Sequence, residues 1–158
     1  MQVQHFLRER GVRFEVLPHE PTFSAQRMAH AVHVAGDWVA KCVLLRVDGL
    51  SENGRYVLAI LPATHQIYFD MAREALDAAT IELAAERELQ RVFRDCESGV
   101  VPPFGSQYGI DTLVDSSLTE DDEIVFESNR HRESIRMSFR SFVEVEHPQI
   151  ALFAYHVY

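Results

Sequence analysis

The sequence has few cysteines and few basic residues, and each shortage excludes a class of protein. The two cysteines among 158 residues, Cys42 and Cys96, show no C-x-x-C spacing, so no disulfide framework, zinc site or redox motif is expected. An intracellular, reducing compartment fits this composition. The 15 lysines and arginines are outnumbered by 24 aspartates and glutamates, which gives a net charge of −9. A broad basic surface for nucleic acid is therefore excluded, and any such contact must be local or assisted by a partner.

Long hydrophobic runs and common catalytic motifs are also missing. No stretch approaches membrane-spanning length, and Met1 to Arg8 lacks the cationic and then apolar pattern of a signal peptide, so we predict a cytoplasmic protein without a membrane partner. A G-x-x-x-x-G-K motif is absent, and Ser98 lacks the G-x-S-x-G context of a nucleophile. His30 and His33 share a predicted helical face without a third ligand nearby, so no metal site is predicted.

The pattern of apolar residues predicts an α+β fold in a single domain spanning 1–158, with a mixed, mainly antiparallel sheet and packed helices. Helices are predicted in five places: 3–10, 22–32, 71–76, 84–93 and 141–146. Strands are predicted in seven places: 13–17, 38–45, 56–61, 80–83, 109–114, 123–128 and 134–139. Asp48-Gly49 and Asn53-Gly54 favour a hairpin between the second and third strands.

Lys41 stands alone as a cation in the apolar run 38–45, which otherwise resembles a buried central strand. Because burying an unpartnered ammonium group is costly, its side chain must reach solvent, meet a carboxylate or carbonyls, or face a ligand. A stem that extends to the sheet edge remains an alternative to a functional role. Alternation along the strand predicts that one face carries Val39, Lys41, Val43, Leu45 and Val47.

The loop Gly99-Val-Val-Pro-Pro-Phe-Gly105 combines two glycines with two prolines. Glycine permits positive φ or close backbone approach, whereas proline fixes φ and removes a donor. We therefore expect a rigid turn that exposes a few main-chain N–H groups and can hold a carbonyl or a developing oxyanion. An ordinary tight loop is the alternative, because these residue types are common in turns.

Together these features resemble the YbaK/ProX family, which comprises free-standing aminoacyl-tRNA deacylases and the editing insertion of bacterial prolyl-tRNA synthetase. The resemblance covers nearly the whole chain and rests on Phe14-x-x-Leu-x-His19, Ala40-Lys41, Leu61-Pro62, Gly99-Val-Val-Pro-Pro103-Phe-Gly105, Val114-Asp115-x-Ser117-Leu118 and His131 after a strand.

The resemblance implies a trans-editing hydrolase that cleaves the ester of mischarged aminoacyl-tRNA and thereby maintains translation fidelity, without a metal or organic cofactor. It implies that Lys41 holds substrate oxygens, that backbone amides from Gly99 to Pro103 bind the aminoacyl carbonyl, and that a ribose hydroxyl helps to activate water. Expected catalytic residues are Lys41, Gly99 and His131, and expected substrate contacts are Val100, Val101, Pro102, Pro103, Phe104 and Asn129.

One departure from the family concerns the turn before His131. Many relatives carry Asn-Ala-Gly there, whereas this chain reads Glu127-Ser-Asn-Arg-His131. Asn129 can adopt the left-handed conformation of glycine, and its side chain would narrow or repolarise the pocket. His131 is expected to bond the substrate or the Gly99 loop, with an exposed turn histidine as the alternative.

The expected partner is the acceptor end of mischarged tRNA, not DNA. Because the chain is acidic, it either relies on a synthetase or elongation-factor partner or contacts only the acceptor end. A non-catalytic module that recognises an aminoacyl or amino-acid-like group is the competing interpretation.

Overall fold

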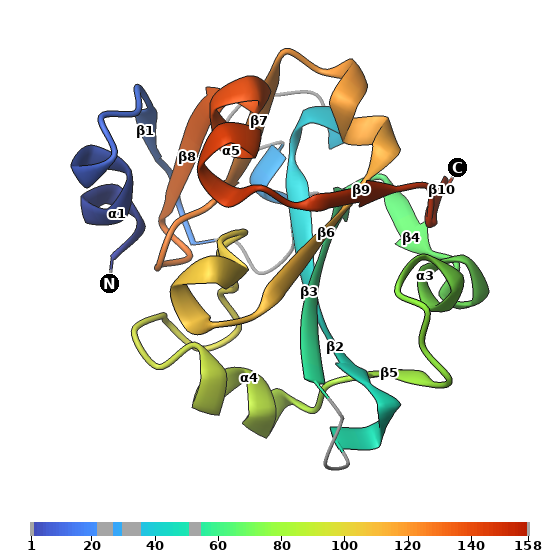
Figure 1. Cartoon of the computed structure of the whole chain (residues 1–158). Helices are drawn as coiled ribbons and strands as arrows, with labels where there is room; N and C mark the ends of the chain where they lie inside the picture. The colour runs from blue at the N-terminus through green and yellow to red at the C-terminus, as the bar shows by residue number, and fades with distance from the viewer. Residues whose placement is uncertain (1, 22–26, 30–35, 51–54, 158) are drawn as a thin grey trace.

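The computed structural model describes residues 2–21, 27–29, 36–50 and 55–157, and its largest sheet has the strand order β5–β2–β3–β6–β9 (Figure 1). These strands are β2 (Ala40–Val47), β3 (Arg55–Pro62), β5 (Ile81–Leu83), β6 (Asp111–Asp115) and β9 (Gln149–Ala151). β2 pairs antiparallel with β3 and β5, whereas β6 pairs parallel with β3 and β9. The mixture of directions confirms the predicted α+β class.

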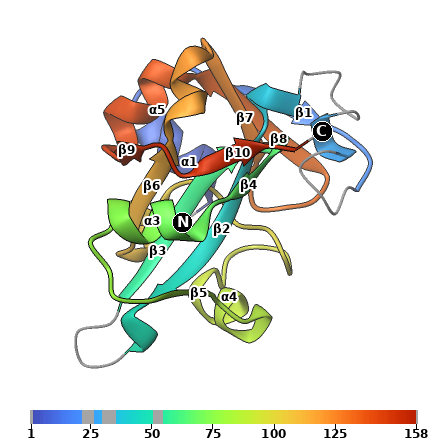
Figure 2. The ribbon, with the colours of Figure 1, turned by 90° about the vertical axis from the view of Figure 1, so that its right-hand side faces the viewer.

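Two smaller antiparallel sheets flank the large one. One has the order β1–β8–β7 and consists of β1 (Glu15–Pro18), β7 (Glu123–Glu127) and β8 (Glu133–Ser138). The other pairs β4 (His65–Ile67) with β10 (Ala154–His156), and Figure 2 shows both strands beside a short helix, α3. A parallel bridge between Val39 and Val125 brings β7 alongside the start of β2.

The helices are short and cover the edges and faces of the sheets. They are α1 (Val3–Glu9), α3 (Phe69–Ala75), α4 (Glu86–Val92) and α5 (Phe139–Glu146), together with the 3₁₀ helices η1 (Gly36–Trp38), η2 (Asp48–Leu50), η3 (Gly105–Tyr108) and η4 (Ser116–Glu120). α5 begins where the Ser138 hydroxyl accepts the Ser141 N–H, and it ends at His147, whose φ is +51°. Within the described residues, no helix is long and apolar enough to cross a membrane.

Most of the helix predicted over 22–32 lies outside the described residues, and so do His30 and His33. Met28 and Ala29, which the apolar stripe assigns to the core, are described and buried.

The two faces of β2 pack into different cores, as strand alternation predicts. Leu45 and Val47, with Val43, pack against α3 in one hydrophobic cluster. Ala40 and Leu44 belong to the other cluster, together with α1, α5 and the Gly99 loop. Each face of the sheet is therefore covered, which explains why β2 and β3 carry apolar side chains on both faces.

Phe104 anchors the Gly99 loop in the larger core. Its side chain is fully buried, and its ring centroid lies 5.3 Å from that of Phe6, 5.4 Å from that of Phe126 and 5.5 Å from that of Phe142. These separations suit tilted and edge-to-face aromatic packing. One residue of the loop thereby holds α1, β7 and α5 together.

The sequence pattern does not predict β4, β9 and β10. Each has three residues, which is too short for an alternating pattern to be visible. Their pairing depends instead on tertiary contacts, such as the hydrogen bond from the Tyr68 N–H to the Phe153 carbonyl.

Candidate active site

The Gly99 loop follows α4 and has the rigid, glycine-dependent backbone that its sequence predicts. Gly99 has a φ of +86°, a value that residues with a Cβ rarely adopt. A Cβ at Gly105 would lie 2.6 Å from the Ile110 carbonyl oxygen and the Thr112 hydroxyl. The first glycine therefore provides positive φ, and the second permits close backbone approach.

Four hydrogen bonds clamp the start of this loop. The Val100 N–H donates to the Glu97 carbonyl over 3.0 Å, and the Glu97 N–H donates to the Asn129 carbonyl over 2.8 Å. The His131 N–H donates to the Glu97 carboxylate over 3.2 Å, and His131 Nε2 lies 2.7 Å from the Ser98 carbonyl oxygen. The turn between β7 and β8 thus fixes the backbone on the N-terminal side of Gly99.

The His131 ring contacts this loop with one nitrogen and Glu127 with the other. Its Nδ1 lies 3.0 Å from Glu127 Oε2. Because a carbonyl oxygen can only accept, Nε2 must carry the hydrogen that bonds Ser98. Burial raises the pKa of Glu127, while the nearby His131 opposes this rise. The exposed-turn interpretation of His131 is wrong, since the residue is 5% exposed.

Two main-chain donors of the loop, the N–H groups of Gly99 and Val101, donate to no acceptor among the described residues. A pocket of about 190 Å³ adjoins the loop and is lined in part by Arg94, Ser98, Gly99 and Val100. Donors fixed by a rigid backbone can bind a carbonyl oxygen and stabilise the negative charge that develops on it.

Lys41 lies near the start of β2, and its Nζ donates to the His65 carbonyl over 2.6 Å. The partner is therefore a carbonyl group, one of the alternatives that the sequence leaves open. Burial lowers the pKa of Lys41. By alternation its side chain is on the face of Val43, opposite the face on which the loop packs. Among the described residues, no hydrogen bond or ion pair joins Lys41 to the Gly99 loop, so the expected convergence on one pocket is not seen.

Asn129 is held by the protein through its side chain. Its Oδ1 accepts the Val3 N–H over 2.9 Å, and its Nδ2 lies 3.3 Å from Cys96 Sγ. The residue is 3% exposed and does not have positive φ, so the left-handed turn considered for it does not occur. The side-chain amide links α1 to the segment before the loop, and a substrate contact of Asn129 stays a prediction.

The remaining predicted contacts differ in exposure. Val101 is partly buried, whereas Val100, Pro102, Pro103 and Phe104 are buried. Any substrate contact of Phe104 would have to use its main chain. These side chains position the loop, and its backbone presents the chemistry.

The two thiols are poorly suited to nucleophilic chemistry. Burial raises the pKa of Cys96 to about 11 and raises the pKa of Cys42 still further. Within the described residues, no group of three or more His, Cys, Asp or Glu side chains is placed to hold a metal ion.

Sequence reasoning assigns no role to Glu97 or Glu127, yet both hold His131. For Glu127 the sequence carries one signal, a carboxylate at the end of the apolar strand Ile124 to Phe126. Like Lys41, it is a charged residue in an otherwise apolar run. For Glu97 the sequence carries no comparable signal, because its contact depends on the tertiary fold.

Comparisons with known proteins agree with this architecture. The chain is 29% identical over 101 residues to the proline–tRNA ligase of Geobacillus thermodenitrificans; the match covers 64% of this chain and 16% of the ligase, so the chain spans about a sixth of that relative's length. The crystal structure of the hypothetical protein APE2540 superimposes with a TM-score of 0.86 at 18% identity, covering 98% of this chain and 100% of the other.

A candidate trans-editing enzyme for prolyl-tRNA synthetase superimposes with a TM-score of 0.80 at 18% identity, covering 97% of this chain and 94% of that one. At such identities the superpositions establish the fold alone. The family model of the aminoacyl-tRNA editing domain matches residues 19–145, which include Lys41, the Gly99 loop and His131. The chain therefore belongs to the aminoacyl-tRNA editing domain family, as the resemblance to YbaK/ProX predicts.

Proposed function

We propose that the protein is a trans-editing deacylase, which hydrolyses the ester between a wrongly attached amino acid and the 3′ end of tRNA. The observation that carries this proposal is the clamped loop, in which the N–H groups of Gly99 and Val101 donate to no acceptor among the described residues. Membership in the editing-domain family supports the same activity.

In the proposed reaction, a water oxygen bonds to the ester carbonyl carbon while an electron pair moves onto the carbonyl oxygen. The two loop N–H groups donate to that oxygen. When the intermediate collapses, the bond between the carbonyl carbon and the ribose oxygen breaks, the ribose oxygen takes a proton that came from water, and the amino acid is released. Removing one such donor typically costs about 100- to 1000-fold in rate.

Lys41 is proposed to act as an electrostatic clamp on substrate oxygens and not as a nucleophile; because it lies on the face of β2 opposite the loop, these are not the carbonyl oxygen that the loop binds. Its amine is partly withdrawn from water, where a positive charge acts more strongly on a ligand. To do so it must exchange the His65 carbonyl for a substrate oxygen. The hydrogen bond over 2.6 Å keeps the ammonium group satisfied until then.

The proposed substrate is the acceptor end of a mischarged tRNA, and no cofactor is required by this chemistry. The similarity to a proline–tRNA ligase and to a candidate editing enzyme for prolyl-tRNA synthetase supports association with a synthetase. A synthetase or elongation factor would deliver the tRNA to an acidic protein that binds it weakly alone.

A panel of mischarged tRNAs, incubated with wild type, Lys41→Met and Lys41→Arg, tests the proposal. Wild type should release at least one amino acid, Lys41→Met should lose most of the rate, and Lys41→Arg should retain part of it because the charge remains. Methionine keeps the apolar stem, so circular dichroism should show an unchanged fold. If wild type releases no amino acid from any member of the panel, the proposed deacylase activity is refuted.

A binding module without turnover is the second candidate, favoured by the engagement of Lys41 with His65 on the face away from the loop. This alternative predicts that wild type binds a non-hydrolysable aminoacyl analogue but leaves every ester intact. Calorimetry with the analogue, run beside the deacylation panel, separates the two.

A further inference from the structure

The arginines divide into those with carboxylate partners and those without. Paired with a carboxylate within 4 Å are Arg46, Arg73, Arg136 and Arg140. Arg55, Arg91 and Arg94 take part in no ion pair among the described residues. These three, from β3, from the last turn of α4 and from the segment after it, lie around one pocket.

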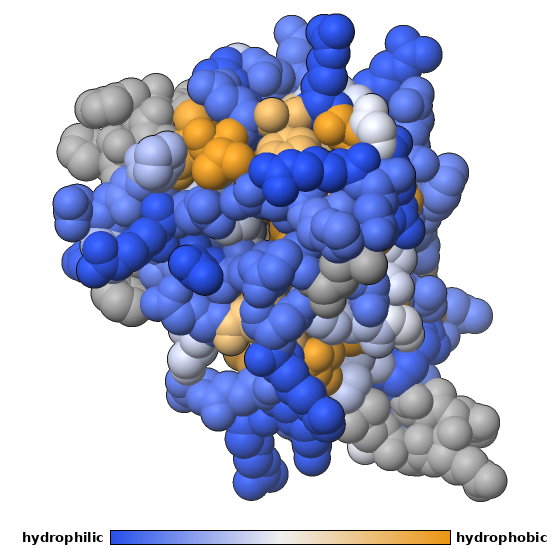
Figure 3. Space-filling view, turned by 90° about the vertical axis from the view of Figure 1, so that its left-hand side faces the viewer, coloured by the Kyte–Doolittle hydropathy of each residue, from blue (hydrophilic) through white to orange (hydrophobic). Residues whose placement is uncertain are grey.

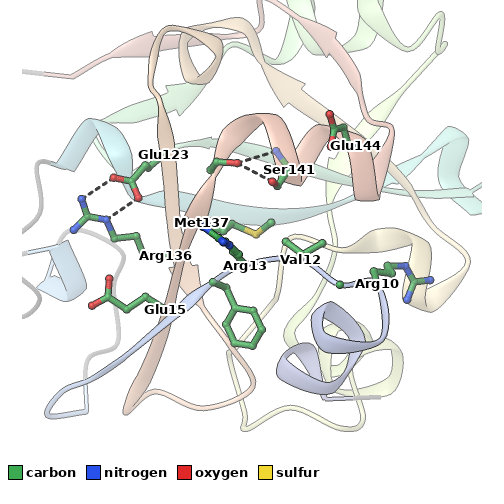
Figure 4. A pocket seen from close by; sticks show the side chains of 12 residues that line it. Arg10, Val12, Arg13, Glu15, Glu123, Arg136, Met137, Ser141 and Glu144 are labelled. Atoms are coloured by element: carbon green, nitrogen blue, oxygen red, sulfur yellow. Dashed lines mark hydrogen bonds and ion pairs between the residues drawn. The ribbon is translucent and has the colours of Figure 1, made fainter.

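A second pocket, of about 650 Å³, offers a contrast, because its charges are balanced. It lies between α1, β1, β8 and α5, and Figure 4 shows Arg136 joined to Glu123 by two hydrogen bonds, of 2.9 and 2.7 Å. Figure 3 shows that this side of the molecule is mostly hydrophilic. Three arginines face three glutamates in this pocket: Arg10, Arg13, Arg136, Glu15, Glu123 and Glu144. It therefore has no preference for an anion.

The pocket lined by Arg55, Arg91 and Arg94, here called the arginine pocket, has a volume of about 550 Å³. Asp111 is the one acidic residue among the described residues that line it. Three guanidinium groups against one carboxylate leave a local excess of positive charge in a chain of net charge −9. Because Arg91 and Arg94 are exposed, solvent screens their repulsion, but the excess of positive charge still favours an anionic ligand.

Hydrogen bonds hold the guanidinium groups of Arg55 and Arg94, Arg91 lies beside the Tyr56 hydroxyl, and most of the guanidinium donors have no partner among the described residues. Arg55 donates one N–H to the Leu76 carbonyl over 3.1 Å, and Arg94 Nε donates to the Arg91 carbonyl over 3.1 Å. Each guanidinium has five N–H donors in a planar fork, a geometry that matches phosphate oxygens. The nearby carboxylate of Glu88 is already engaged by Arg46 and by the Tyr56 hydroxyl.

The arginine pocket also adjoins the candidate active site. Arg94 lines both this pocket and the smaller pocket beside Gly99. A polyanion that reaches the Gly99 loop along α4 therefore passes the three arginines.

We propose that the arginine pocket binds a backbone phosphate of the tRNA acceptor stem, and so positions the stem while the aminoacyl end occupies the Gly99 loop. This inference rests on the proposed deacylase function and names the local contact that an acidic protein needs. Phosphate contacts fix the position of a nucleic acid without reading its sequence, so the pocket would accept any tRNA body.

Fluorescence anisotropy with an uncharged acceptor-stem RNA hairpin, measured from 50 to 200 mM KCl, tests the inference. Wild type, Arg91→Gln and Arg94→Gln are compared with Arg87→Gln, which removes an exposed arginine of the same helix that does not line the pocket. Loss of one phosphate contact should weaken binding at low salt and reduce the slope of log K against log salt by about one. Over this fourfold rise in salt, wild type should then lose about 3.5-fold more affinity than either pocket variant.

Equal affinities and slopes for wild type and both pocket variants would overturn the inference, as would an equal loss in Arg87→Gln. Calorimetry with inorganic phosphate separates nucleic acid from a small phosphorylated ligand: if phosphate binds and the hairpin does not displace it, the assignment to tRNA is wrong. Because the hairpin carries no amino acid, these results do not depend on hydrolysis. In deacylation assays Arg91→Gln, which changes a residue that does not line the pocket beside Gly99, should raise KM and leave kcat unchanged.

Discussion

Replacing Gly99 with alanine should abolish deacylation at a small cost in stability. A residue with a Cβ pays about 1–2 kcal/mol for a left-handed backbone. The added Cβ would lie 3.7 Å from the His131 ring, which is an ordinary van der Waals distance, so no steric term is added to the strain. For a chain of this length the melting temperature should fall by roughly 2–8 °C.

The effect on rate follows from the clamp on the preceding residue. Because His131 holds the Ser98 carbonyl, relief of strain at Gly99 must rotate the chain that follows and displace the Val101 N–H. Loss of that donor predicts a rate lower by about 100- to 1000-fold.

Gly49→Ala is the matched control for this experiment. Gly49 has a φ of +66°, and a Cβ there would meet nothing within 4 Å. It lies at the end of the β2–β3 hairpin away from Lys41. The control should lose similar stability, measured by thermal unfolding, and keep wild-type turnover of a mischarged tRNA. Comparable rates for the two variants would refute the assignment of the loop as the oxyanion site.

Two further predictions concern stability. Phe104→Ala removes a fully buried ring and should lower the free energy of unfolding, measured by urea denaturation, by about 3–5 kcal/mol. Phe69→Ala, at a 41% exposed position, should lower it far less. Equal losses would contradict the packing described. Burial and neighbouring carboxylates raise the pKa of Asp121 from its ordinary value of 3.8 to about 6, so this group destabilises the fold increasingly between these two pH values and by a constant amount above them. Asp121→Asn should therefore be more stable than wild type by about 1 kcal/mol near pH 8, after allowance for solvent screening, and the difference should vanish below about pH 3. A difference in unfolding that is independent of pH would contradict this origin.

Much of the fold can be predicted from the sequence, because many of its features depend only on residues that are close together in the chain. The alternating faces of β2 and the positive φ of Gly99 follow from strand geometry and from the absence of a Cβ. Predicted boundaries differ by a few residues, as at α5, which begins at Phe139 and not at Ser141.

The site required the tertiary structure, since its contacts join distant segments. The pairing of Glu127 with His131, the His65 carbonyl that receives Lys41, and the pocket formed by Arg55 with α4 are not visible in any window of sequence. The sequence also predicts one cleft for Lys41 and the loop. In the structure, strand alternation places Lys41 on the face of β2 opposite the one on which the loop packs.

The hydrogen bond from the Val3 N–H to Asn129 joins residues 126 positions apart, and Asn129 in turn accepts the Glu97 N–H. The first helix and the β7–β8 turn are thus two ends of one brace on the Gly99 loop. During synthesis this brace cannot close until residue 129 has emerged, so the loop gains this support late in folding. Shortened forms that lack the first helix would retain the loop sequence but lose one of its supports.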